Sequence, residues 1–272
     1  MFMCKHLFIK VLLIIIFNFN YLIAQQEVIK LDYLLTVSYT PEILNYRNTT
    51  LIVSDKFSYY DVDYSPKSKG SLKESYDQIL DGQVDKKEYF SEILIDRNQL
   101  ILKENTFDRR GTKEFLSIQE ELPKMSWKIE SEINIISGYR CHKAKLKFRG
   151  RKYTAYFTNE IPVTIGPWKF NGLPGVIVSI YDETGIYKWE LKKIKETQSI
   201  NEKFKSFNGR SEKFKKVSYK EFDKNLIDAK LKKLRVAKSR TDSRGFTVRH
   251  SFSTEQWLEP SNEFRSKTNF SM

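Results

Sequence analysis

Alternation of apolar and polar residues marks several segments of the chain as half-buried β-strands. In residues 31–39, every second position is apolar or aromatic, so one face of an extended segment would be buried and the other would face water. Residues 50–60 repeat the pattern, with an interruption in the middle that indicates a turn or a bulge. A hairpin is predicted over residues 89–104, because a polar run separates two apolar segments. Further short strands are predicted over residues 115–118 and 126–129.

The clearest alternation lies in residues 141–157, where two strands are joined by a turn at residues 149–151. One face of the first strand carries apolar residues and one histidine, whereas the other carries Cys141 and a row of basic residues. A two-residue turn keeps the apolar faces of the two strands together, so one side of this hairpin is predicted to be core and the other exposed and basic. Further strands are predicted over residues 176–181 and 186–194.

Two segments combine a capping-box sequence with helical spacing of apolar residues. The first predicts a short helix over residues 71–81 and the second a longer one over residues 218–236. Residues 195–217 are rich in Lys, Ser and Asn and are predicted to form a long exposed loop. Residues 246–252 are predicted to form a last strand, and residues 261–272 a frayed tail.

These elements predict a single α+β domain over residues 25–260. The chain shows neither the strand–helix–strand alternation of a parallel sheet nor the fixed period of a solenoid. We therefore expect a curved antiparallel sheet built of hairpins, with two packed helices. A helix across the inner face of that sheet would give an open half-barrel, an architecture that resembles the lipid and lipoprotein carriers of the Gram-negative envelope by analogy only.

The first 24 residues have the pattern of a secretory signal peptide. A basic start precedes an apolar run at residues 11–17, which is short for a membrane span, and the small residue Ala24 follows. We expect cleavage near Ala24 and a periplasmic or extracellular protein. An uncleaved anchor is the alternative, because Leu22 is larger than the residue preferred three positions before a cut. A lipoprotein is not expected, since Cys4 precedes the apolar run instead of following it.

Positive charge is concentrated in residues 191–250, which carry 19 Lys and Arg against 7 Asp and Glu, whereas residues 25–190 carry 24 of each. Such a block could bind an anionic envelope surface or an acidic polymer, and nucleic acid is disfavoured as the partner of an exported protein. A solvated face without a partner is the alternative. After cleavage Cys141 would be the sole cysteine, so no internal disulfide is expected.

The segment GPWKFNGLPG, residues 166–175, combines glycines and prolines with large apolar residues. Proline cannot donate to a strand ladder and glycine permits tight approach or positive φ, so the segment is predicted to be a bent, restricted connector. Its aromatic residues could plug the end of the sheet, or they could form the rim of a ligand groove or a partner-docking surface. The candidate site residues are Gly166, Pro167, Trp168, Phe170, Gly172, Leu173, Pro174 and Gly175.

The order of motifs around this segment resembles the GLPGLI family. GY-x-C-x-KA is followed by a basic strand that ends in an RG turn, then by F-T-x-E-I-P and GPWKFNGLPG, and the name-giving motif reads GLPGVI over residues 172–177. The resemblance is strongest over residues 127–194. It implies an exported protein of a Gram-negative bacterium, and it implies no activity, cofactor or catalytic residue.

Motifs for known chemistry are missing from the sequence. No HExxH, CxxC, GxSxG, phosphate-binding loop or dinucleotide fingerprint occurs, so no metal, cofactor or catalytic residue is predicted. Cys141 and His142 are neighbours on a predicted strand and would point to opposite faces, so both could not easily bind one ion. His142 is expected to be a hydrogen-bonded core residue. Cys141 as a nucleophile is an open alternative, although the sequence places no base beside it.

Three functions follow as hypotheses. The first is a non-enzymatic binding or carrier module, which holds an apolar or amphipathic ligand under the curved sheet behind residues 166–175. The second is an interaction or assembly factor that docks to an outer-membrane protein or system through this loop and the basic surface. The third is a hydrolase with an unrecognised site.

Overall fold

The computed structural model describes residues 28–40, 43–63, 91–108, 114–197 and 200–242. The predicted signal peptide, the helix over residues 71–81, the strand over residues 246–252 and the frayed tail lie outside the described residues. No described helix is long and apolar enough to cross a bilayer.

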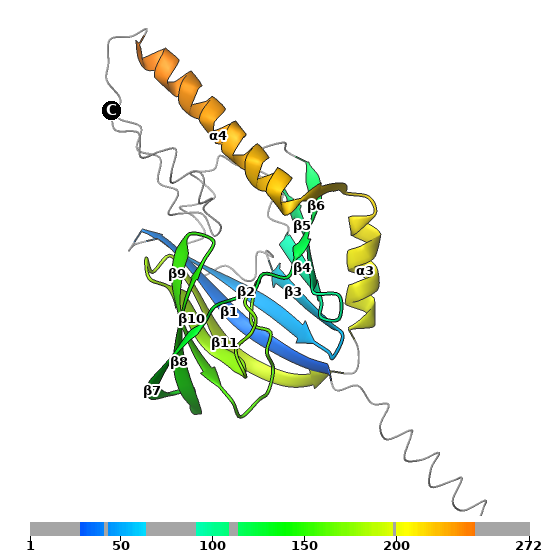
Figure 1. The fold of residues 1–272 in the computed structure, drawn as a ribbon, viewed down its shortest axis with the longest axis vertical. Helices are drawn as coiled ribbons and strands as arrows, with labels where there is room; N and C mark the ends of the chain where they lie inside the picture. The colour runs from blue at the N-terminus through cyan, green and yellow to red at the C-terminus, as the bar shows by residue number, and fades with distance from the viewer. Residues whose placement is uncertain (1–27, 41–42, 64–90, 109–113, 198–199, 243–272) are drawn as a thin grey trace, which may run out of the picture.

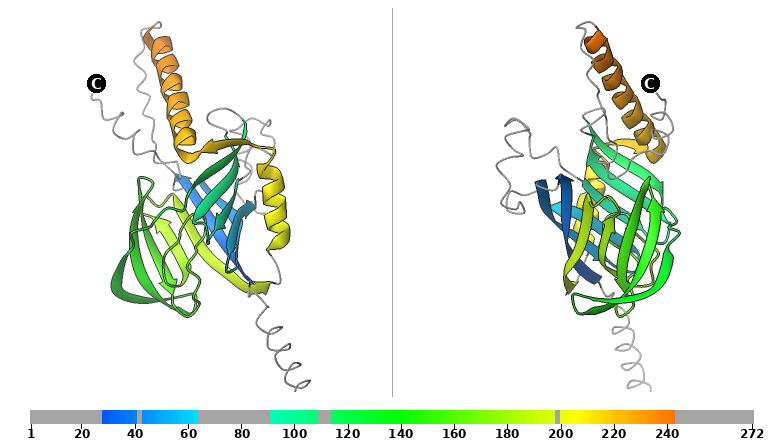
Figure 2. Two further views of the ribbon diagram at one scale, coloured as in Figure 1. Left: turned by 45° about the vertical axis from the view of Figure 1, so that its right-hand side comes forward. Right: turned by 90° about the vertical axis from the view of Figure 1, so that its left-hand side faces the viewer.

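A single twelve-stranded sheet dominates the described chain, and it curves without closing (Figures 1 and 2). Its order is β12-β6-β5-β4-β3-β2-β1-β11-β10-β9-β8-β7, and every neighbouring pair is antiparallel except β12 and β6. The strands are β1 Val28–Thr40, β2 Ile43–Val53, β3 Phe57–Asp63, β4 Ser91–Asp96, β5 Ile101–Phe107, β6 Phe115–Glu121, β7 Lys128–Ile136, β8 Tyr139–Phe148, β9 Arg151–Thr158, β10 Val176–Asp182, β11 Tyr187–Thr197 and β12 Lys215–Ser218. The predicted sheet-dominated fold is confirmed, although the sheet is mixed.

Short turns between consecutive strands explain why the hairpin predictions hold. Arg149 and Gly150 join β8 to β9 with φ of 48° and 76°, and Ser137 and Gly138 join β7 to β8 with φ of 51° and 84°. Two residues with positive φ match the right-handed twist of paired strands. All strands predicted between residues 31 and 194 are present, and most are longer than predicted.

The predicted loop over residues 195–217 is wrong. Strand β11 continues to Thr197, helix α3 spans Asn201–Ser211, and β12 follows. The helix forms because Ile200, Phe204 and Phe207 recur at helical spacing and pack on the outer face of the sheet, where Phe207 is fully buried. The predicted helix over residues 218–236 is confirmed as α4, Tyr219–Asp242, which begins beside β12 and β6 and extends beyond the sheet (Figures 1 and 2).

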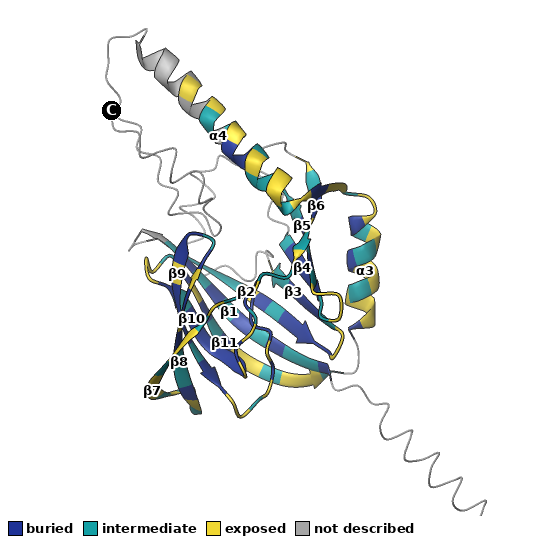
Figure 3. Ribbon diagram, viewed as in Figure 1, coloured by how far each residue is buried: buried dark blue, intermediate teal, exposed yellow. Residues whose placement is uncertain are grey.

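Apolar residues cover both faces of the central strands and create two cores. On β2–β4, alternate residues point to opposite sides of the sheet. Ile52, Tyr59 and Leu94 meet α3 on the outer face, whereas their sequence neighbours join the larger inner core. In Figure 3, buried residues recur along β1, β2, β10 and β11, the strands that supply much of the inner core. Among the described residues, the β9–β10 connector packs on the inner face, and the first turn of α4 packs at the β6–β12 edge. The inner-face helix of the expected half-barrel stays a prediction, because the predicted helix over residues 71–81 lies outside the described residues.

Candidate functional site

The GPWKFNGLPG loop lies against the inner face of the sheet, with its large side chains in the core. Trp168, Phe170 and Leu173 are each no more than 5% exposed. The ring of Trp168 stacks on Trp189, with centroids 6.2 Å apart and planes 13° apart, and Phe170 meets Tyr153 edge to face at 4.9 Å. The aromatic residues therefore fill the space that a ligand under the sheet would need.

Hydrogen bonds within the connector fold the loop into a compact turn. The N–H of Gly166 donates to the carbonyl of Phe170 at 2.8 Å, and the N–H of Gly172 donates to the carbonyl of Thr164 at 2.8 Å. Trp168 and Gly172 have φ of 54° and 88°. A positive φ is uncommon for a tryptophan, and the aromatic contacts of Trp168 hold it there. The glycines and prolines thus set the path of a packed segment, as the sequence predicted.

A smaller part of the loop reaches the surface. Gly172 and Pro174 are exposed and Gly166, Pro167 and Gly175 are buried. The segment before β7 crosses this exposed part, where the indole N–H of Trp127 donates to the carbonyl of Asn171 at 2.7 Å. The loop therefore offers a partner a narrow rim and not an aromatic surface.

Lys169 carries a charge into this core, and sequence reasoning missed its role. Its side chain is 0% exposed, and its Nζ lies 2.8 Å from Glu104 Oε2 and 3.4 Å from Glu120 Oε1. Arg149 also pairs with Glu120, and its guanidinium lies 3.5 Å from the ring centroid of Tyr219. Two cations and two carboxylates thus tie the loop to β5, β6 and the first residue of α4. The one sequence signal was the position of this lysine between two aromatic residues, Trp168 and Phe170.

A buried carboxylate, that of Glu92, fixes α3 to the outer face. Glu92 accepts hydrogen bonds from Tyr59 Oη at 2.8 Å, Asn105 Nδ2 at 3.0 Å and Arg210 Nε at 2.8 Å. Burial and the nearby carboxylates of Asp61 and Glu92 raise the pKa of Tyr59, so its hydroxyl stays a donor. With its oxygens occupied by three donors, Glu92 has the environment of a structural anchor and not of an acid–base catalyst.

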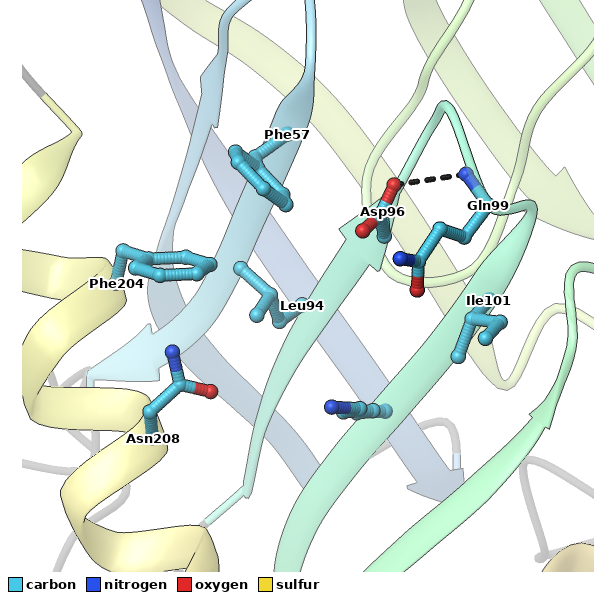
Figure 4. A pocket seen from close by; sticks show the side chains of 8 residues that line it. Phe57, Leu94, Asp96, Gln99, Ile101, Phe204 and Asn208 are labelled. Carbon is cyan, nitrogen blue, oxygen red and sulfur yellow. Dashed lines mark hydrogen bonds between the residues drawn. The ribbon is translucent and has the colours of Figure 1, made fainter.

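A small surface pocket lies between α3 and the β4–β5 hairpin (Figure 4). Its volume is about 90 Å³, whereas pockets that enclose small organic ligands span about 300–1,000 Å³. The one carboxylate that lines it, Asp96, already accepts the backbone N–H of Gln99 at 2.9 Å. The lining residues are Phe57, Leu94, Asp96, Gln99, Ile101, Lys103, Phe204 and Asn208. This pocket is too small for a lipid.

The arrangement of Cys141 and His142 differs from the prediction. Cys141 lies on the same face of β8 as the lysines, as predicted, but it is fully buried and not exposed. The segment after β9 folds back beside it, since Glu160 accepts the N–H of Arg140 at 3.2 Å and Ile161 packs against the same core. His142 is half-buried, and its ring lies 5.6 Å from that of Phe157. Within the described part of the chain, no three His, Cys, Asp or Glu side chains gather in a group that could hold a metal ion.

Cys141 is expected to be chemically inert in the folded protein. Burial raises the pKa of its thiol, and the thiolate is the reactive form. In protein recovered after export, we expect a disulfide reagent at pH 8 to modify Cys141 about 100-fold more slowly than in the same protein unfolded in urea. Absorbance of the released thiolate measures both rates. Equal rates in the folded and unfolded protein would contradict the burial and return Cys141 to consideration as a nucleophile.

Comparisons with known proteins support a fold and no activity. A family model described as "Protein of unknown function (Porph_ging)" matches residues 149–179, which include β9 and the loop. No curated protein matches the chain. Two structures of PNGF-II, in space groups C2 and P21, are similar at 16% and 14% identity, with TM-scores of 0.51 and 0.48. Both matches cover 75% of this chain, which spans about a third of PNGF-II, 33% and 34%. The likeness to the first structure is one of fold alone.

Proposed function

We propose that the protein is a non-enzymatic interaction module of the bacterial envelope, which docks an acidic surface of an outer-membrane protein. The observation that carries this proposal is the position of Trp168, Phe170 and Leu173 under the sheet. A carrier would have to move these side chains out before a ligand could enter. Exposing each of them costs about 1.5–3 kcal/mol, so the packed state favours contacts at the surface over a ligand inside.

A basic edge, defined as Lys213, Lys216, Lys220 and Lys224, supports the choice of partner. These four lysines are exposed and surround β12, the first strand in the order of the sheet. Lys215 in the same segment pairs with Glu114 at 3.1 Å. Glu212 and Glu221 are also exposed in this segment, so the basic edge carries an excess of positive charge and is not uniformly basic. Such an excess attracts an oppositely charged surface and speeds association, in a manner that added salt weakens.

We also propose to which family the protein belongs and in which compartment of the cell it works. The match to a family of unknown function covers residues 149–179, and the motif order over residues 138–177 supports membership of the GLPGLI family. Export follows from the signal-peptide pattern before Ala24, with the mature protein in the periplasm or outside the cell.

Reversing charge on the basic edge tests the proposal. We expect Lys213→Glu, Lys216→Glu and Lys220→Glu together to weaken sedimentation of the protein with native outer-membrane fragments at least tenfold. The matched control reverses three exposed lysines elsewhere, Lys152, Lys188 and Lys192, and should bind as the unaltered protein does.

Two results would contradict the proposal. Equal losses in both triple variants would mean that net charge, not the basic edge, controls binding. Binding that survives protease treatment of the membrane fragments would mean that the partner is not a protein.

A further inference from the structure

The two edges of the sheet differ in how they are protected. β12 has four residues, two of them lysines, and runs directly into α4. Short length, lysines and a covering helix are the usual means of blocking edge-to-edge pairing. β7 has nine residues and ends the strand order at the other side, and in the described part of the chain no strand pairs with its outer edge. Among the described strands, the edge at β7 is therefore the one open to another strand.

Exposed isoleucines follow this open edge. Ile129, Ile133 and Ile135 are 51%, 41% and 80% exposed. The acidic residues between them are already neutralised, since Lys143 lies 2.7 Å from Glu132 and Lys145 lies 3.0 Å from Glu130. A strand with exposed apolar side chains and neutralised charges suits an apolar strand as its neighbour.

The hairpin geometry decides which backbone groups are available. Ser137 and Gly138 form a two-residue turn, so the flanking residues Ile136 and Tyr139 are a hydrogen-bonded pair. Pairs alternate along an antiparallel ladder, which makes Ile133 and Ile135 non-hydrogen-bonded toward β8. Their N–H and C=O groups therefore point to the open edge. A bulge between Ile129 and Ile133 separates Ile129 from this segment.

We propose that β7 pairs with β7 of a second copy of this chain, antiparallel, with the two-fold axis at Asn134. In this register Ile133 lies opposite Ile135 of the second copy, and Ile135 lies opposite its Ile133. Each opposing pair exchanges two backbone hydrogen bonds, so four bonds and four clustered isoleucines join the copies. Asn134 faces Asn134, and Glu132 falls opposite Ile136, so no like charges oppose each other.

Neighbouring registers of this β7–β7 pairing are less favourable, so the sequence of β7 favours pairing with a second copy in the register given above. The N–H and C=O groups of Ile133 and Ile135 point to the open edge, and they can bond to the second copy only if the strands shift by an even number of residues. One such shift places Ile135 opposite Ser131, and the other places Ile133 opposite Ser137 in the turn. The segment Ile133-Asn134-Ile135 is thus complementary to itself. The contact is small, so a dimer in the micromolar range is expected.

Sedimentation velocity of the purified protein between about 1 and 200 µM tests the assembly. The unaltered protein should shift from monomer to dimer, and Ile135→Lys should weaken the dimer at least tenfold. Ile129→Lys, a matched change on the same strand beyond the bulge, should leave dimerisation unchanged. A protein that stays monomeric throughout, or one weakened equally by both lysines, overturns the proposal.

A cross-link tests the register. Opposing residues of a non-hydrogen-bonded pair have Cα atoms about 4.5 Å apart, within the range of a disulfide. Asn134→Cys should therefore form a disulfide-linked dimer under mild oxidation, whereas Lys128→Cys and the unaltered protein should not. Absence of the link in Asn134→Cys, or equal linking in Lys128→Cys, overturns this register. The basic edge lies at the opposite end of the strand order, so docking and dimerisation can fail separately.

Discussion

Gly175→Ala is expected to destabilise the fold severely. A Cβ at this position would lie 1.9 Å from the carbonyl oxygen of Thr158, 2.7 Å from its carbonyl carbon and 3.0 Å from the Cα of Asn159. All three are backbone atoms at the end of β9, so no side chain can rotate away. β10 begins at the next residue, where Val176 pairs with Thr158, so relief of the clash would break the β9–β10 pairing. We expect a loss above about 4 kcal/mol, a large share of the stability of a typical domain.

The measurement for Gly175→Ala is thermal or urea unfolding, followed by circular dichroism. Gly209→Ala is the matched control, because its Cβ would meet open space on α3. Alanine favours helix over glycine, so this variant should gain up to about 1 kcal/mol. A Gly175→Ala protein that unfolds cooperatively within a few degrees of the unaltered one would contradict the position of the loop.

Lys169→Met is expected to destabilise the fold by about 3–5 kcal/mol, the usual cost of removing one partner from a buried ion pair. Methionine fills a similar volume, so the loss of stability would come from the removed charge and not from a cavity. Arg149 still neutralises Glu120, but Glu104 loses its ion pair in a position that is largely shielded from water. The effect should include a weaker attachment of the loop to β5.

A double-mutant cycle isolates this interaction. Glu104→Gln in the Lys169→Met background removes the charge left behind, so the double variant should be more stable than Lys169→Met alone. Urea unfolding of the four proteins gives the coupling energy. Additive losses would show that Lys169 and Glu104 do not depend on each other.

The strands were predictable because alternation is a local property. Each hairpin pairs neighbouring segments, so the apolar faces and turns near Arg149 and Asp96 could be placed from residues close in sequence. Helix α3 was missed because its single apolar stripe, Ile200, Phe204 and Phe207, lies in a segment rich in Lys, Ser and Asn. That composition is typical of an exposed loop, and it was given more weight than the spacing of the apolar residues.

The loop was only partly predictable. Its glycines and prolines indicated a restricted path, which the structure confirms. Whether Trp168 and Phe170 point inward depends on how far the sheet curves, and that curvature comes from strands distant in the sequence. The partners of Lys169 lie 65 and 49 residues away, at Glu104 and Glu120, so no local pattern reveals them. Cys141 lies on the predicted face of β8, but its burial was not predicted, because the segment after β9 covers it.

Native mass spectrometry of the protein recovered from its own cell envelope tests the central claim most directly. If Trp168, Phe170 and Leu173 occupy the inner face permanently, the folded protein should show the mass of its polypeptide, as a monomer or a dimer, with no added small molecule. Near-ultraviolet circular dichroism would verify that the same sample keeps its aromatic packing. A reproducible extra mass that is released on denaturation as a lipid or another apolar molecule would contradict the account and favour a carrier.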